Sequence, residues 1–204
     1  MRWLESSVLA LLIPVAAAAC PADLSTLTHD GPVTITVCPG GDGESLADVG
    51  SVVTVTVVDP AGVPVADLPI ADMVLSEPWW GPDAVLHYCE TSARAGFAAD
   101  APTDASGVAT FSGTLAAGGW SDLGLTAKLW CGDFTVVAET LGPPLQIRIN
   151  SPDLNGDGRV NLNDFGIFGE AYASTTWICD FTHDGLVSLA DFAAFGSHYA
   201  HACE

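Results

Sequence analysis

The feature that most constrains this chain is a twelve-residue acidic segment that occurs twice near the C-terminus, at residues 153–164 and 180–191. In each copy, oxygen-bearing side chains stand at positions 1, 3, 5, 9 and 12 around a glycine at position 6. They are Asp153, Asn155, Asp157, Asn161 and Asp164 in the first copy, and Asp180, Thr182, Asp184, Ser188 and Asp191 in the second. Ca²⁺ takes about six to eight oxygen ligands, and the glycine permits the sharp turn around the ion. The pattern therefore predicts two Ca²⁺ sites.

An aromatic pattern follows each acidic segment. The aromatic residues recur at helical spacing and are Phe165, Phe168 and Tyr172 after the first segment, and Phe192, Phe195 and Tyr199 after the second. This spacing puts them on one face of a short helix. We expect the four phenylalanines to form a small core between two helices. Gly169 and Gly196 fall in the same helices, and we expect them to mark a close approach of one helix to the other.

Both copies fit the frame D-x-x-x-D-G-x-V-x-L-x-D-F-x-x-F-G-x-x-Y, and the tail formed by residues 151–204 resembles a type I-like dockerin, the duplicated Ca²⁺-binding module of bacterial cellulosomes. Unlike an ordinary EF-hand pair, the tail has Asp164 and Asp191 at position 12 and no helix entering the first loop. The resemblance implies that the carbonyls of Arg159 and Leu186 also bind Ca²⁺, and that Asn161 and Ser188 act through water. Thr182 replaces the usual Asn or Asp, so the second site should be weaker.

The same resemblance implies a cohesin-like protein domain as the partner, bound through loop positions 10 and 11. Those positions are Leu162-Asn163 and Leu189-Ala190, and they lack the hydroxyl-rich pairs of well-known cellulosomal dockerins. The resemblance therefore implies docking onto a cohesin-type partner or a cell-surface assembly, with a different specificity.

The chain from residue 22 to residue 150 reads as all-β. Runs that are rich in β-branched residues or that alternate predict strands at residues 33–37, 52–58, 108–112, 125–130, 134–138 and 145–149, with turn clusters between them. Residues 55–65 and 103–111 resemble turns of bacterial Ig-like domains of the invasin and intimin type. The expected fold class is a mainly β Ig-like sandwich at residues 20–150, followed at residues 151–204 by a small α dockerin module with two calcium loop–helix repeats.

The N-terminus reads as a secretory signal peptide at residues 1–19. Arg2 precedes an apolar run at residues 8–19, which is shorter than a membrane span of about 20 residues. Small residues precede Cys20, whose acylation is an alternative. The net charge of −20 argues against nucleic-acid partners, because phosphate binding needs clustered Lys and Arg. We therefore expect a secreted, extracellular or cell-surface protein.

Six cysteines in an exported chain predict disulfides. If each cysteine pairs with the one in the same segment of the chain, the pairs are Cys20–Cys38, Cys89–Cys131 and Cys179–Cys203. His198 and His201 lie one helical turn apart. They would suit a transition-metal site, but a polar helix end is the commoner use of such a pair.

The sequence contains no nucleophile elbow, HExxH motif, phosphate loop or dinucleotide fingerprint. The first hypothesis is a non-catalytic exported protein that docks through Ca²⁺-dependent contacts. Two alternatives remain open: a carbohydrate-binding or adhesive surface protein, and a small polysaccharide-degrading component. Trp79 and Trp80 would form the sugar platform in the first alternative, although plugging one end of the sandwich is the commoner use of buried aromatic residues.

Overall fold

The computed structural model describes residues 23–28, 33–59, 61–78, 85–92, 94–131, 134–139 and 144–204. The predicted signal peptide, Cys20, Trp79 and Trp80 lie outside these described residues. Within the described part of the chain, no helix has the length and apolar character needed to cross a membrane.

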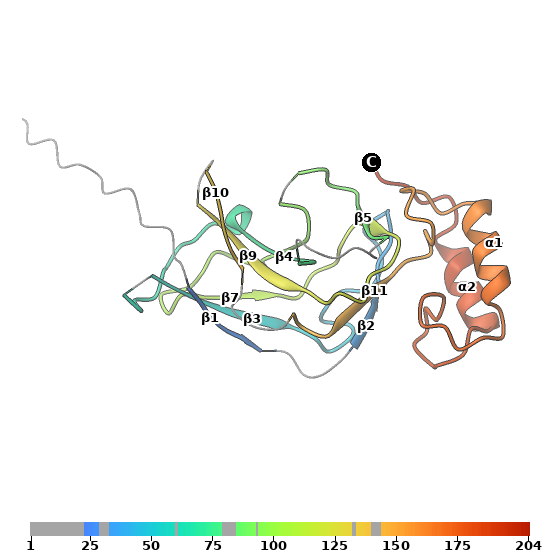
Figure 1. Ribbon diagram of the computed structural model, residues 1–204, viewed down its shortest axis with the longest axis horizontal. Coiled ribbons are helices and arrows are strands. Elements are labelled where there is room, and N and C mark those ends of the chain that lie inside the picture. Colours follow the sequence, from blue (N-terminus) through green and yellow to red (C-terminus); the bar gives the residue numbers. More distant parts are fainter. Residues whose placement is uncertain are drawn as a thin grey trace, which may run out of the picture.

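Within the described residues, the β-rich part forms four small sheets. Figure 1 shows how their strands are arranged. One antiparallel sheet has the order β1-β3-β7, with β1 at Asp23–Thr28, β3 at Val53–Val58 and β7 at Val108–Phe111. A second has the order β10-β9-β4-β6, with β10 at Phe134–Glu139, β9 at Thr126–Cys131, β4 at Met73–Ser76 and β6 at Phe97–Ala98. Two strand pairs complete the set: parallel β11 (Ile147–Asn150) with β2 (Val33–Thr36), and antiparallel β5 (His87–Tyr88) with β8 (Ala117–Gly118). A 3₁₀ turn, η1, spans Ile70–Asp72.

The sheets bury one common set of apolar side chains. In β3, Val53, Val55 and Val57 are buried and the intervening residues are only partly covered, which is the period-two pattern of a strand with one face on a core. Phe111 of β7 and Leu129 of β9 belong to the same cluster, together with residues of β2, β4 and β11. Two larger sheets that share one core are compatible with a β-sandwich.

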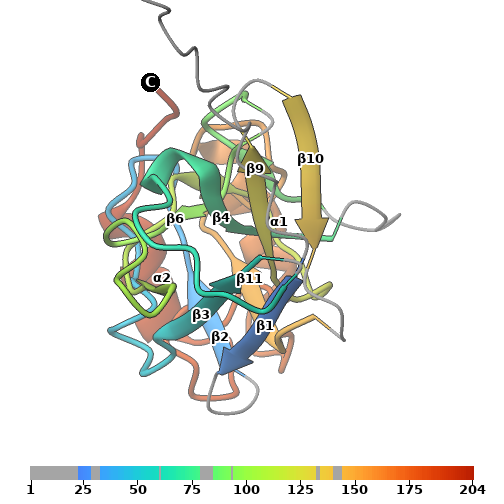
Figure 2. The same ribbon diagram turned by 90° about the vertical axis from the view of Figure 1, so that its left-hand side faces the viewer.

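The C-terminal segment, residues 151–204, contains α1 (Leu162–Ala171) and α2 (Leu189–Ser197), which lie together at one end of the molecule (Figure 1). Viewed along the long axis, the helices stand behind the sheets (Figure 2). Each helix begins with a capping box, which pairs Asn161 with Asp164 and Ser188 with Asp191. A second core unites both repeats. It consists of Leu154, Val160, Phe168, Cys179, Phe181, Val187 and Phe195.

The expected fold class is wrong. The described residues form mainly small β-sheets with only two short helices, of 10 and 9 residues, and do not show a helical dockerin module. Most of the C-terminal segment is loop, because its backbone groups bond to other loops and to the β-rich part. One example is Gly119, whose N–H donates to the Asp153 carbonyl at 2.6 Å. The segment therefore packs as a loop-rich extension of the β-rich part.

The expected four-phenylalanine core is only half right. Phe168 and Phe195 are buried, whereas Phe165 and Phe192 are 43% and 42% exposed. The expected close approach at the helix glycines is wrong, because a Cβ added at Gly169 or at Gly196 would meet no atom within 4 Å.

The predicted disulfide pairing is also wrong. Cys89 is bonded to Cys203, and Cys38 and Cys179 are both free and buried. The reason lies after α2, where Ala200 adopts a left-handed φ of 71° and turns the chain back. The Cys203 N–H then donates to the Gly158 carbonyl, at 2.9 Å, which carries Cys203 to the first repeat and away from Cys179.

Candidate metal-binding loops

Acidic loop 1, residues 153–164, directs its first and last carboxylates inward. Asp153 accepts hydrogen bonds from the N–H groups of Asp157 at 3.1 Å and Gly158 at 2.8 Å. Asp164, at the start of α1, accepts from the N–H groups of Asn155 at 3.1 Å and Asn161 at 2.8 Å. Both carboxylates are fully buried, so the loop closes around them.

Acidic loop 2, residues 180–191, repeats these contacts at equivalent positions. Asp180 accepts from the N–H groups of Asp184 at 3.2 Å and Gly185 at 2.9 Å. Asp191 accepts from the N–H groups of Thr182 at 2.9 Å and Ser188 at 2.8 Å. The duplication in the sequence is therefore also a duplication of geometry.

The backbone of the two loops turns in the same way. Position 4 is left-handed in both, with a φ of 67° at Gly156 and 58° at His183. Position 6 is left-handed as well, with a φ of 83° at Gly158 and 89° at Gly185. Histidine is among the residues that tolerate this region better than most, so loop 2 keeps the path without a glycine at position 4.

Three carboxylates converge in loop 2. One oxygen from each of Asp180, Asp184 and Asp191 lies within 4.8 Å of the others. Like charges at such a distance repel one another unless a cation lies between them. Every side-chain atom predicted to bind the metal in the two loops is an oxygen. The predicted backbone ligands, the carbonyls of Arg159 and Leu186 at position 7, also supply oxygen. Ca²⁺ prefers such a hard donor set and Zn²⁺ does not, so the residues present fit calcium.

The side chains at positions 3 and 9 of both loops form hydrogen bonds within the chain. The Asn161 side chain accepts the Asn163 N–H at 2.8 Å, and the Ser188 hydroxyl accepts the Ala190 N–H at 3.1 Å. Both therefore serve as helix caps, consistent with reaching a metal only through water. At position 3, the Thr182 hydroxyl donates to Asp191 at 2.9 Å, whereas the Asn155 carbonyl accepts the Asp157 N–H at 2.9 Å.

The electrostatics of the two loops differ. Burial raises the pKa of Asp153 and of Asp164 above the usual carboxyl value, since it disfavours the charged form. Burial acts in the same direction on Asp191, but hydrogen bonds from Ser188 and Thr182 outweigh it and lower its pKa. Burial therefore decides the direction of the pKa shift at Asp153 and Asp164, whereas hydrogen bonds decide it at Asp191.

Loop 1 is fitted closely against the β-rich part. A Cβ added at Gly118 would lie 1.8 Å from Asp153 Oδ2, and one added at Gly156 would lie 2.4 Å from the Val85 carbonyl. Glycine is therefore required on both sides of the contact. The glycine pair at residues 118–119 is visible in the sequence, but nothing in its local pattern connects it with an acidic segment about 35 residues later.

Each loop also pairs with the chain that leaves the other repeat's helix. The Val160 N–H donates to the His201 carbonyl and the Ala200 N–H to the Val160 carbonyl, both at 2.9 Å. Likewise, the Val187 N–H donates to the Ser174 carbonyl and the Ala173 N–H to the Val187 carbonyl, both at 2.9 Å. The repeats thus support each other about an approximate twofold relation.

The helices expose matched pairs of apolar side chains. Leu162 and Leu189, at loop position 10, are 71% and 70% exposed, and Tyr172 and Tyr199 are 47% and 46% exposed. With Phe165 and Phe192, these residues form what we call the repeat face. Large apolar side chains repeated in this way suggest a surface that binds a partner.

The sequence analysis did not predict two contacts that attach acidic loop 2 to the β-rich part. The Asn150 side chain donates to the carbonyls of Trp177 at 2.9 Å and Asp180 at 3.1 Å, and His183 lies 2.9 Å from a Glu44 carboxylate oxygen. Both contacts join residues far apart in the chain, so no local pattern signals them.

Comparison with known proteins returns no matching protein-family model and no matching curated protein. The functional interpretation therefore depends on the residues and their geometry.

Proposed function

We propose that this chain is an exported, non-catalytic binding protein. In this proposal two Ca²⁺ ions, held by acidic loops 1 and 2, order the C-terminal segment for docking onto a partner protein of the cohesin type. The observation that carries the proposal is the repetition of the same carboxylate hydrogen bonds in both loops. The Cys89–Cys203 disulfide is compatible with an extracellular location.

Each ion would be held by the side chains at positions 1, 3, 5 and 12 and by the carbonyl at position 7. In loop 2, a Ca²⁺ ion would supply the positive charge that the three converging carboxylates lack. The chain itself orients these groups, because backbone N–H groups fix the carboxylates at both ends of each loop.

Docking would use the repeat face. Its apolar side chains belong to α1, α2 and the residues beside them, so ordering the two loops also orders this face. The resemblance of the two repeats to dockerins is one of sequence, and it supports a cohesin-type domain as the occupant. Leucine at both position-10 sites favours an apolar contact, where hydroxyl pairs would favour hydrogen bonds.

Calorimetric titration of the mature chain with Ca²⁺ tests the metal sites. We expect two binding events. Asp157→Ala should remove one and Asp184→Ala the other, and both positions are exposed, so neither change threatens the fold. Asp104→Ala is the matched control. Asp104 also accepts hydrogen bonds from backbone N–H groups, those of Ser106 and Val108, but its turn is not predicted to bind a metal ion. Fewer than two events, or equal loss in the control, would contradict the proposal.

Binding to a panel of purified cohesin domains tests the partner. We expect binding in Ca²⁺ that disappears in EDTA, and loss of binding in the variant Leu162→Asp with Leu189→Asp. Val63→Asp is the control, since Val63 is 56% exposed and lies in the β-rich part. Binding that persists in EDTA, or that Val63→Asp abolishes equally, would contradict the proposed docking.

A further inference from the structure

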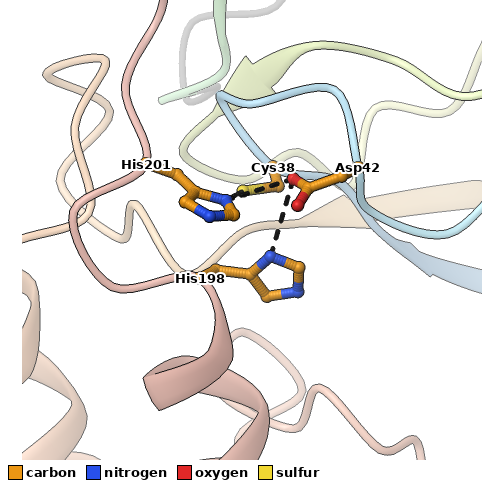
Figure 3. Close-up of side chains that lie close together, drawn as sticks. All are labelled: Cys38, Asp42, His198 and His201. Carbon is orange, nitrogen blue, oxygen red and sulfur yellow. Dashed lines mark hydrogen bonds and ion pairs between the residues drawn. The ribbon is translucent and has the colours of Figure 1, made fainter.

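A second cluster of metal-binding side chains lies outside the acidic loops. Cys38 and Asp42 come from the loop after β2, and His198 and His201 come from the end of α2 and the chain beyond it (Figure 3). The four ligand atoms lie within 4.8 Å of one another. The sequence suggested only the histidine pair; folding adds a cysteine and an aspartate from about 160 residues earlier.

The distances within the cluster match the edges of a tetrahedral metal site. His201 Nδ1 lies 3.4 Å from Cys38 Sγ and 3.2 Å from Asp42 Oδ1, and His198 Nδ1 lies 3.7 Å from the same oxygen. Zn–S and Zn–N bonds of about 2.3 and 2.0–2.1 Å at tetrahedral angles separate neighbouring ligand atoms by about 3.3–3.6 Å. One ion can therefore reach all four of these atoms with small shifts.

Two further observations indicate a ligand between these side chains. His198 Nδ1 is buried and has no hydrogen-bond partner in the described structure, although buried polar atoms are nearly always satisfied. A Cβ added at Gly40 would lie 2.9 Å from Asp42 Oδ1 and 3.1 Å from His201 Nδ1. The backbone at Gly40 therefore lies close against two of the four side chains, and a larger residue there would displace them.

We propose that Cys38, Asp42, His198 and His201 bind one Zn²⁺ ion that clamps the end of the chain to the β-rich part. The thiolate and the two imidazoles are donors that select Zn²⁺ over Ca²⁺. A thiolate and a carboxylate together balance the charge of the ion. Four protein ligands close the coordination sphere, which is characteristic of a structural zinc site.

A catalytic cysteine is the competing interpretation of a cysteine beside a histidine. Cys38 is completely buried, and this burial raises the pKa of its thiol to about 12. Reactive cysteines lie instead in partly exposed surroundings that favour the thiolate. A metal ion would deprotonate the thiol directly, without requiring access for a substrate.

The site would also connect to acidic loop 1. The His201 carbonyl accepts the Val160 N–H, and Cys203, two residues further on, is bonded to Cys89. Zinc binding would thus hold the same short stretch of chain that supports loop 1. The proposal does not depend on Ca²⁺ binding, because none of the four ligands belongs to an acidic loop.

Zn²⁺ titration of the mature, Ca²⁺-saturated protein, purified without reductant, tests the site. We expect one Zn²⁺ per chain. Asp42→Ala should weaken binding by more than about 100-fold, as should Cys38→Ala and His201→Ala, because each removes a direct ligand. Asp42 is 53% exposed, so its loss leaves the fold intact. Gly40→Ala keeps all four ligands and should still weaken binding at least about tenfold.

Cobalt substitution identifies the ligands. Co²⁺ in the wild-type protein should show a thiolate-to-cobalt charge-transfer band and the intense visible bands of four-coordinate cobalt, and Cys38→Ala should lose the former. Cys179→Ala and His183→Ala are matched controls: the first removes another free buried thiol, and the second removes another histidine beside a carboxylate. Absence of stoichiometric Zn²⁺ binding, a six-coordinate cobalt spectrum, or equal loss in the controls would overturn the proposal.

Discussion

The two loop–helix repeats share one local geometry but are attached to the β-rich part in different ways. Repeat 1, residues 153–172, is held by close packing: the Asp153 carboxylate fills the space beside Gly118, and Cys203 bridges the adjacent chain to Cys89. Repeat 2, residues 180–199, is held by polar contacts, with Asn150 donating to the Asp180 carbonyl and His183 beside Glu44.

This difference shows which residues determine which property. Residues inside the repeated frame fix the loop, the capping box and the buried phenylalanine, and these agree between the copies. Residues outside the frame determine the attachment, and they have no counterpart in the other copy. We therefore expect changes inside the frame to affect both repeats alike, and changes at the contacts to separate them.

The largest expected effect follows from removing the disulfide. The bond between Cys89 and Cys203 spans 114 residues, and a loop of that size stabilises by about 4–5 kcal/mol in the chain-entropy model. Replacing both cysteines with Ala should lower the free energy of unfolding by a similar amount, measured in guanidinium chloride. Hydrogen exchange should show a greater loss of protection at the Gly158 amide than at the Gly185 amide. Equal loss at both would contradict the separate attachment of the repeats.

The buried phenylalanines test the likeness of the two repeats. Phe168→Ala and Phe195→Ala should each cost about 3–5 kcal/mol, less if the small core collapses, because both rings are buried in one cluster. The same change at Phe165 or Phe192 should cost far less, since each ring is more than 40% exposed. Thermal and denaturant unfolding measure all four variants. A clear difference between Phe168→Ala and Phe195→Ala in the loss of unfolding free energy would show that the two repeats do not contribute equally to their shared core.

Much of the secondary structure could be predicted, because its signals are local. The six expected strands correspond to β2, β3, β7, β9, β10 and β11, and most of them are rich in β-branched residues. The short strand β4, at Met73–Ser76, was missed because four wholly buried residues show no alternation. Both helices contain the two phenylalanines whose spacing predicts a helix after each acidic segment.

The arrangement of these elements could not be predicted. Phe165 and Phe168 share an aromatic pattern, and only packing decides that Phe168 is the buried one. The disulfide partner of Cys203 depends on the turn at Ala200, which has neither Gly nor Pro to signal it. The Cys38 cluster joins residues about 160 positions apart, so its ligands could not be grouped from their spacing.

A smaller effect is expected where repeat 1 meets Gly118. Gly118→Ala would place a Cβ 1.8 Å from Asp153 Oδ2, so the carboxylate must move. Such overpacking costs about 1–3 kcal/mol. Denaturant unfolding measures the cost, and Ca²⁺ calorimetry should show weaker binding at loop 1 with loop 2 unchanged. Gly113→Ala is the control, because a Cβ there meets nothing within 4 Å. Equal weakening at both loops would contradict the local role of this contact.

The smallest expected effect concerns the polar attachment of repeat 2. A hydrogen bond from His183 to Glu44, the largest influence, outweighs burial and raises the histidine pKa, and Asp180 adds to the rise. Because the folded-state pKa exceeds the unfolded value, this contact stabilises the protein fully below the unfolded pKa. The stabilisation is lost as pH rises through the folded pKa. The pair is partly exposed, so its contribution is below about 1 kcal/mol.

His183→Asn suits the left-handed backbone at this position and removes the charge. Urea unfolding in EDTA should therefore separate the wild-type protein from the variant at about pH 6, and the difference should shrink towards pH 8.5. Glu44→Gln should remove the same pH dependence, since Glu44 is the partner that raises the pKa. A difference that grows with pH, or one that persists unchanged in the Glu44→Gln background, would show that repeat 2 is not attached through this ion pair.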